Sequence, residues 1–153
     1  MLLQPIGALL DFASEELKND KEVVLEAIHN NPEALEFASN HLKADREVVY
    51  ESVANVGWTY CYADDTLRHD KDLLLAGLKK TGQILYFAEP KMRDDEEVVL
   101  EAVKNKGIIV KYASSRLKEN KQIAVEAMKQ NKKSYEFLGE HIKQEEDIKK
   151  LLE

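Results

Sequence analysis

The sequence has a single cysteine, no long apolar run and no excess of positive charge. Cys61 is the only cysteine among 153 residues, so the chain can form neither an internal disulfide bond nor a zinc site from its own cysteines. No apolar stretch approaches the roughly 20 residues that span a bilayer. The opening MLLQPIGALLDF lacks the basic start and long apolar core of a secretion signal. We therefore expect a cytoplasmic protein of a reducing compartment.

The charge balance is acidic. Lys and Arg number 22 against 29 Asp and Glu, which gives a formal net charge of -7. Nucleic acids and anionic membranes are bound by basic surfaces, so we expect neither as a partner. A hydrophobic content of 44% is too high for a disordered chain, and the length suits one domain. The sequence predicts a single folded domain over residues 1–153.

A unit of 25 residues recurs along the chain without insertion or deletion. Its first complete copy reads DKEVVLEAIHNNPEALEFASNHLKA. The full units are 20–44, 45–69, 70–94, 95–119 and 120–144, with a half unit at 1–19 and a C-terminal cap at 145–153. Self-similarity at a fixed period is the sequence signature of a repeat array.

Each unit begins with the pattern of an amphipathic helix of about ten residues. Counted from the leading acid, positions 4, 5, 8 and 9 are apolar or small, and these positions form one stripe of an α-helix. Asp or Asn at position 1 is a good N-cap. At position 13, Gly57, Gly82 and Gly107 predict a left-handed helix end, and Pro32 prevents continuation.

The second half of each unit predicts another short helix. Its apolar residues stand at positions 15, 16, 19 and 23, on one helical face. Position 18 is always aromatic, and we expect its ring to wedge between adjacent units. One unit buries too little apolar surface to offset the entropy of ordering its backbone, so the units must stack. The sequence therefore predicts an all-α fold, a solenoid or superhelix of tandem 25-residue two-helix repeats.

Both ends continue the same register. Leu2 and Leu3 fall on positions 8 and 9 of the half unit, so the chain starts inside a repeat. Ile148 continues an apolar column at the C-terminal end, whereas Lys149 and Lys150 replace residues that are mostly apolar elsewhere. A terminal cap that faces water needs such a replacement.

The copy DDEEVVLEAVKNKGIIVKYASSRLKEN at residues 94–120 resembles the tandem helical repeats of a family called domain of unknown function 4116. The shared pattern is D-x-E-V-V-L-x-A-V-K-x-N-G-x-x-L-x-Y-A-S-x-x-L, and it covers nearly the whole chain. Pro32 and Lys132 depart from it at the glycine position, and Gly77 departs at the alanine position. The resemblance brings no assigned activity and no functional residues.

Two charged columns have a structural and a functional interpretation. Position 24 is always basic, as Lys18, Lys43, Arg68, Arg93, Lys118 and Lys143. A basic ladder could hold an extended anionic partner, but surface charges that balance the acids at position 1 are the stronger interpretation. The glutamates at position 7 could bind a basic peptide, although a solvated helix face accounts for them better. They are Glu26, Glu51, Glu101 and Glu126.

The repeats differ most at positions 14 and 17, where the outer units carry charge and the middle units carry apolar or aromatic residues. The resulting candidate patch contains Trp58, Cys61, Tyr86 and Ile108, with Tyr50 and Tyr60 at its border. Apolar residues on one face of adjacent repeats favour an interaction surface. Two alternatives remain open, because these rings could instead pack as ordinary core or form a homodimer contact.

No motif for catalysis, metal or cofactor binding stands out. The histidines His29, His41, His69 and His141 lack an i, i+4 ligand spacing, and the acidic run at 94–97 lacks the glycine of a calcium loop. An active site needs unlike residues that converge, whereas a repeated residue serves a repeated contact. We expect no enzyme but a non-catalytic repeat scaffold that binds another protein or peptide. The alternative is a structural or self-assembling segment of a larger repeat protein.

Overall fold

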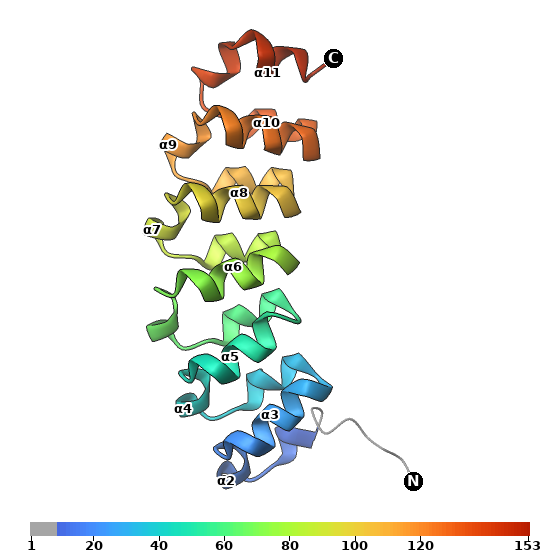
Figure 1. Ribbon diagram of the computed structural model, residues 1–153, viewed down its shortest axis with the longest axis vertical. Coiled ribbons are helices and arrows are strands. Elements are labelled where there is room, and N and C mark those ends of the chain that lie inside the picture. The colour runs from blue at the N-terminus through green and yellow to red at the C-terminus, as the bar shows by residue number, and fades with distance from the viewer. Residues whose placement is uncertain (1–8) are drawn as a thin grey trace. The chain divides into compact units, whose positions relative to one another are not determined.

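A computed structural model describes residues 9–153, and its regular structure in that range is entirely helical (Figure 1). The chain divides into two compact units, Met1–Lys80 and Thr81–Glu153, so the division falls inside the repeat 70–94. The structure defines each unit separately. The single domain over residues 1–153 and the solenoid therefore remain predictions. Leu2 and Leu3 lie outside the described residues.

The long helices begin where the sequence predicts them. They are α3 (Lys21–Asn30), α5 (Arg46–Val53), α6 (Lys71–Lys80), α8 (Glu96–Asn105) and α10 (Lys121–Gln130). The leading residue caps each helix as expected: an Asp20 carboxylate oxygen accepts hydrogen bonds from the backbone N–H groups of Glu22 and Val23 at 3.0 and 3.1 Å. The Asn120 side chain caps α10 by accepting from the N–H of Ile123 at 3.1 Å. The N-cap prediction is confirmed.

The second half of each repeat holds two short helices where the sequence predicted one. A 3-10 helix comes first, as η1 (Leu10–Phe12), η2 (Pro32–Phe37), η3 (Gly57–Tyr62), η5 (Gly82–Phe87), η6 (Gly107–Tyr112) and η7 (Lys132–Phe137). A shorter helix follows, as α2 (Glu15–Lys18), α4 (Asn40–Lys43), η4 (Asp65–Leu67), α7 (Pro90–Arg93), α9 (Ser115–Lys118) and η8 (Ile142–Gln144). The two-helix repeat is therefore wrong in detail, because each full repeat has three helical segments. The restart at the C-terminal cap is α11 (Glu146–Lys150), with Ile148 buried as expected.

Two extended residues cause the break between the short helices. In the repeat 95–119 they are Ala113 and Ser114, both with ψ of 159°. The N–H of Ser114 then donates to the backbone carbonyl of Arg93 in the preceding repeat at 2.9 Å, while the Ser114 hydroxyl accepts from the N–H of Leu117 and caps α9. The same inter-repeat backbone bond joins Ser39 to Lys18, Asp64 to Lys43 and Gly139 to Lys118. The break is thus the connection between repeats.

Glycine at position 13 permits close packing and does not form a left-handed turn. No glycine among residues 9–153 has a positive φ, so the predicted left-handed helix end is wrong. A Cβ on Gly82 would lie 2.6 Å from the carbonyl oxygen of Ala102 in the next long helix. A Cβ on Gly107 would collide in the same way with the carbonyl of Ala127. The missing side chain lets the 3-10 helix approach the next long helix.

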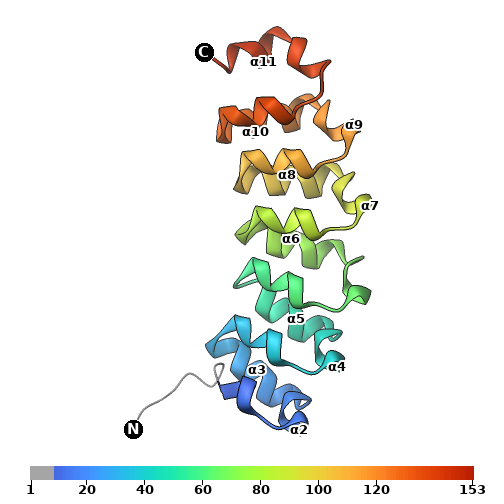
Figure 2. The same ribbon diagram turned by 180° about the vertical axis from the view of Figure 1, so that it is seen from behind.

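The 3-10 helices η2, η3 and η6 each pack against the long helix of their own repeat and against the next one. In the first compact unit η2 contacts α3 and α5, and η3 contacts α5 and α6; in the second, η6 contacts α8 and α10 (Figures 1 and 2). The apolar columns meet in these contacts, and Leu35, Val49 and Val110 are 0% exposed. The next repeat supplies one wall of these core layers. The stability of a repeat therefore depends on its contacts with its neighbours.

Ion pairs cross the repeat junctions in a fixed direction. The base at position 2 contacts acids at positions 1 and 3 of the next repeat: Lys21 Nζ lies 2.9 Å from Asp45 and 2.7 Å from Glu47. The same arrangement joins Arg46 to Asp70, and Lys121 to Glu145 and Asp147. Burial raises the pKa of Asp45, but the hydrogen bonds from Lys21 and from the backbone N–H of Val48 outweigh it and hold the pKa below its ordinary value.

One junction has the opposite charge at position 2. Glu96 stands there in place of a base, and it contacts Arg116 of its own repeat at 3.1 Å. Arg116 also contacts Asp94 at 3.1 Å. The following repeat carries the neutral Asn120 and Gln122 where the first full repeats carry acids at positions 1 and 3. The loss of the base is therefore matched by the loss of the acids that it would have met.

One helix cap comes from a neighbouring repeat. The capping position that Ser114 fills in its own repeat holds Gly139 in the last one. The carboxylate of Glu119, from the preceding repeat, instead accepts hydrogen bonds from the N–H groups of Ile142 at 2.8 Å and His141 at 3.4 Å. A Cβ on Gly139 would collide with this carboxylate. Glu119 therefore replaces a serine cap and occupies the space that a serine would need.

The substitutions Glu119→Ala and Gly139→Ser should each destabilise the protein, whereas the double substitution should restore most of the loss. Removal of the Glu119 cap is expected to cost about 1 kcal/mol. Gly139→Ser alone places a side chain against the carboxylate, but in the double variant the serine can cap its helix as Ser114 does. Urea unfolding of the four proteins measures this cycle, and additive single effects would contradict it.

The Asp45→Asn variant should lose less of its unfolding free energy in acid than the unchanged protein does. The pKa of Asp45 is lowered by folding, so its contribution is present above its unfolded pKa and disappears as the pH falls through the folded pKa. Asparagine can retain the cap, as Asn120 does. Urea unfolding at pH values from about 5 down to 2 should give a shallower dependence for the variant. An unchanged slope would show that this junction contributes nothing.

Candidate protein-binding surfaces

Trp58 and Tyr86 of the predicted patch each belong to an aromatic cluster, and each compact unit holds one of these clusters. In the first, the rings of Trp58 and Tyr62 meet edge to face with centroids 5.2 Å apart. In the second, the Tyr86 ring lies 5.0 Å from that of Phe87 and 5.1 Å from that of Tyr112. We call them the Trp58 cluster (Trp58, Cys61 and Tyr62) and the Tyr86 cluster (Tyr86, Phe87 and Tyr112). All of these residues lie on the 3-10 helices η3, η5 and η6.

Both clusters present aromatic surface to solvent. Tyr86 is 56% exposed, Phe87 47% and Trp58 38%. Large apolar rings exposed next to one another are unusual on a surface that binds nothing, because each ring buries a large apolar area when it is covered. The interpretation of these rings as ordinary core fits Tyr86 least, since more than half of its surface is open.

The remaining predicted patch residues differ in burial and in position. Cys61 and Ile108 are half-buried. Tyr50 is 39% exposed, but it belongs to the long helix α5, where the Arg46 guanidinium lies 5.9 Å from its ring centre. The structure therefore does not place Tyr50 in the Trp58 ring pair.

Tyr60 was wrongly placed at the border of the patch. Its side chain is 0% exposed. Tyr60 stands at position 16 of its repeat, the column that holds Leu35 and Val110, and both of those are also 0% exposed. Its place on the buried stripe outweighs its aromatic type, and Tyr60 is a core residue of the first unit.

The residues that the sequence-based patch missed are the rings at position 18. Tyr62, Phe87 and Tyr112 were expected to wedge between repeats, yet Phe87 is exposed and the other two are half-buried. The rings of Tyr62 and Phe87 contact Trp58 and Tyr86 of their own repeats, whereas the ring of Tyr112 contacts Tyr86 of the preceding repeat, as expected of a ring between repeats. The aromatic column at position 18 was the signal for these rings in the sequence. Because every repeat carries an aromatic residue there, the column did not distinguish an exposed ring from a packed one.

The two clusters have different charged neighbours. The Tyr62 hydroxyl donates to the carboxylate of Glu36 at 3.1 Å, and burial together with this bond raises the pKa of Tyr62 to about 12. In the second unit, Lys111 Nζ lies 4.8 Å from the ring centre of Tyr112 and 6.0 Å from that of Phe137. The Trp58 cluster is thus bordered by an acid, and the Tyr86 cluster by a base.

A small cavity adjoins the Tyr86 cluster. It has a volume of 190 Å³ and is lined by Pro90, Arg93, Tyr112, Ala113 and Ser114. Within the described part of the chain, the Nε of Arg93 is buried and has no hydrogen-bond partner. A buried donor without an acceptor is costly in free energy.

The basic column at position 24 is half-buried in every repeat. Its backbone carbonyls accept the inter-repeat hydrogen bonds, and Lys143 Nζ lies 5.6 Å from the ring centre of Tyr135. These bases therefore cover apolar surface with the aliphatic parts of their side chains.

Over residues 9–153 we find no group of three histidine, cysteine or acidic side chains arranged to hold a metal ion, and no helix with the length and apolarity to cross a membrane.

Cys61 should be a slowly reacting thiol. Burial raises its pKa above the ordinary value, so the thiolate that attacks alkylating reagents is scarce near neutral pH. We expect iodoacetamide to modify the folded protein more slowly than the same protein in urea, as measured by mass spectrometry over time. Equal rates would show that Cys61 is fully accessible. Since it is the only cysteine, no other residue obscures the measurement.

Comparison with known proteins gives one family. The family model described as domain of unknown function (DUF4116) matches residues 6–43, 45–93 and 95–143. No curated protein and no solved structure matches the chain. The three matches follow one another in the register of the 25-residue repeat and cover most of the sequence. The chain therefore belongs to the family of domain of unknown function 4116, as its repeat pattern predicted.

Proposed function

We propose that the protein is a non-catalytic repeat scaffold that binds another protein or peptide through its exposed aromatic clusters. The observation that supports this most is the Tyr86 cluster, in which two exposed rings and a half-buried one contact one another beside a cavity. Tyrosine and tryptophan are the residues most often found at the energetic centre of protein interfaces.

The chemistry of the Tyr86 cluster favours a peptide with an apolar side chain followed by a hydrogen-bond acceptor. The rings of Tyr86 and Phe87 offer the apolar area. Arg93 lines the adjoining cavity, and its positive charge would favour a backbone carbonyl or a carboxylate there. Lys111 beside Tyr112 adds positive charge, so an acidic segment fits this surface better than a basic one.

The structural roles of the polar residues that recur along the repeats support a scaffold over an enzyme. The acids at position 1 cap helices, the bases at position 2 cross the junctions, and Ser114 and Glu119 satisfy backbone N–H groups. Apart from the Glu119 cap, these roles recur in several repeats. Catalysis would require unlike groups gathered at one point, and the repeat pattern offers no reason for such a gathering.

The substitutions Tyr86→Ala and Trp58→Ala, separately and together, should weaken partner capture while helicity remains. A ring at the centre of an interface contributes about 2 kcal/mol or more, so the affinity should fall at least about 30-fold at the cluster that binds. The measurement is affinity capture from an extract of the source cells, followed by titration of the captured partner. Circular dichroism checks that the variants are folded.

Phe12→Ala is the matched control, because Phe12 is 85% exposed and belongs to neither cluster. If Phe12→Ala weakens capture as much as Tyr86→Ala does, general stickiness accounts for the binding. If the ring variants unfold, the rings belong to the core. Sedimentation over a concentration series separates the alternative, since a dimer that is lost in Tyr86→Ala would assign the surface to self-association.

A further inference from the structure

The charges of the chain are divided unequally between the two compact units. Residues 1–80 carry 8 Lys and Arg against 15 Asp and Glu, a formal net charge of -7, whereas residues 81–153 carry 14 of each and are neutral. The whole excess of acid therefore belongs to the unit that holds the Trp58 cluster. A partner that approaches this cluster meets a negative field, which favours a basic segment over an acidic one.

The side chain at position 17 lies against the position 18 ring of the next repeat. Within the Tyr86 cluster this contact joins two rings, and Lys111 Nζ lies 6.0 Å from the ring centre of Phe137. In the first unit the same two positions hold Glu36 and Tyr62, and the Tyr62 hydroxyl donates to Oε2 of Glu36 at 3.1 Å. Position 17 therefore sets the charge beside these rings, and this charge is negative at Tyr62.

Two carboxylates border the Trp58 cluster. Burial and the bond to Glu36 raise the pKa of Tyr62 to about 12, so the hydroxyl keeps its proton and remains the donor. The charge of Glu33 also raises the pKa of Tyr62, which means that a second carboxylate lies near the same hydroxyl. Glu33 and Glu36 are exposed on η2, and η2 packs against η3.

Trp58 supplies an aromatic face beside these acids. Its side chain is 38% exposed, and its ring meets that of Tyr62 edge to face. The face of an indole attracts a cation more strongly than the face of a phenol or a phenyl ring. A guanidinium group can stack on such a face and also pair with a carboxylate. The junction between repeats 20–44 and 45–69 therefore offers both contacts that an arginine side chain uses.

The chain has a base of its own near this cluster. The charge of Arg68 lowers the pKa of Cys61, although burial raises it more. The Nε of Arg68 lies 2.6 Å from Asp65 of the same repeat. This cation is therefore paired with an acid other than Glu33 and Glu36.

We propose that the Trp58 cluster binds a basic peptide segment, with an arginine side chain against the Trp58 indole and its guanidinium group paired with Glu36. This inference rests on the proposed function, because it names the chemistry of the partner at one of the two clusters. It assigns to the Trp58 cluster the charge preference opposite to that of the Tyr86 cluster.

Trp58 is the only tryptophan of the chain, so its fluorescence reports on this cluster alone. The probe is a short capped peptide of arginine, serine, leucine and glycine, and its control carries citrulline, an uncharged isostere, in place of each arginine. Titration of the full chain with the arginine peptide should change the fluorescence until it saturates. The citrulline peptide should bind about tenfold more weakly, since it loses both the cation–π contact and the ion pair.

A charge-neutralising variant tests the role of Glu36. Glu36→Gln keeps an acceptor for the Tyr62 hydroxyl and removes only the charge, so it should weaken binding of the arginine peptide about fivefold. Binding of the citrulline peptide should not change. Glu16→Gln is the matched control, because Glu16 is exposed on α2, two repeats earlier, and its loss changes the net charge equally. It should leave the titration unchanged, since salt screens charges outside the site.

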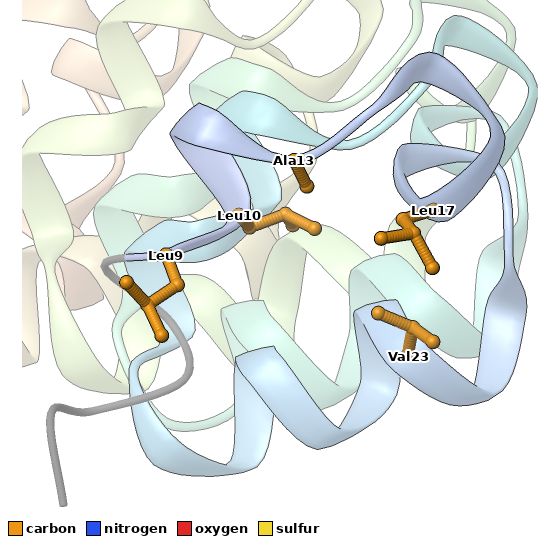
Figure 3. Close-up of a pocket in the computed structure, with 5 residues that line it drawn as sticks. All are labelled: Leu9, Leu10, Ala13, Leu17 and Val23. Carbon is orange, nitrogen blue, oxygen red and sulfur yellow. The ribbon is translucent and has the colours of Figure 1, made fainter.

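A second control tests general adhesion of the peptide to apolar surface. The first unit has an apolar cavity of 240 Å³ that contains no residue of the Trp58 cluster (Figure 3). It is lined by Leu9, Leu10, Ala13, Leu17 and Val23. Leu17 is 45% exposed, so Leu17→Gln alters this lining at little cost to folding. This variant should bind the arginine peptide as the unchanged chain does.

Several results would overturn the inference. They are equal binding of the arginine and citrulline peptides, no response of Trp58 to either one, and a loss in Glu16→Gln or Leu17→Gln as large as that in Glu36→Gln. A dimer of the chain that Trp58→Ala abolishes would also overturn it, because the occupant would then be a second copy. The proposed function fails by a different result, namely partner capture that survives substitution of both clusters. Capture that depends on Trp58 while the two peptides bind alike would overturn the charge preference alone.

Discussion

One backbone hydrogen bond, from the N–H at position 20 to the carbonyl at position 24 of the preceding repeat, determines how neighbouring repeats meet. The bond from Ser114 to Arg93 requires extended residues at Ala113 and Ser114. An α-helix cannot continue through them, so the second half of the repeat separates into a 3-10 helix and a short helix. The 3-10 segment then approaches the next long helix so closely that position 13 favours glycine.

Much of the fold follows from the sequence because its causes are local. The acid at position 1 caps a helix through atoms two and three residues away, and the apolar columns set which face of that helix is buried. The break at Ala113 is different, since the apolar positions before and after it fit one continuous helix equally well. What decides between them is a carbonyl in another repeat, and a pattern within one repeat does not contain that partner.

The candidate site was harder to predict than the fold, for a related reason. Trp58 and Tyr86 departed from their columns and were recognisable as exceptions, and they remain exposed. Tyr62, Phe87 and Tyr112 kept to their column, so nothing in their spacing separated a packing role from a surface role. Tyr60 shows the opposite error, because an aromatic type that is unusual at a position can still be accommodated by the core. Exposure depends on the shape of neighbouring helices, which spacing does not fix.

The junction between repeats 95–119 and 120–144, where Glu96 replaces the base at position 2, has a consequence for the order of the repeats. Repeat 95–119 carries Glu96 where the repeats of the first unit carry a base, and the repeat after it has lost the facing acids. If repeat 95–119 were placed before 45–69, Glu96 would meet Asp45 and Glu47, and three carboxylates would share one junction. Repeat 95–119 is therefore not interchangeable with the repeats that carry a base at position 2. The charges at positions 1, 2 and 3 therefore favour the natural order over one in which repeat 95–119 precedes repeat 45–69.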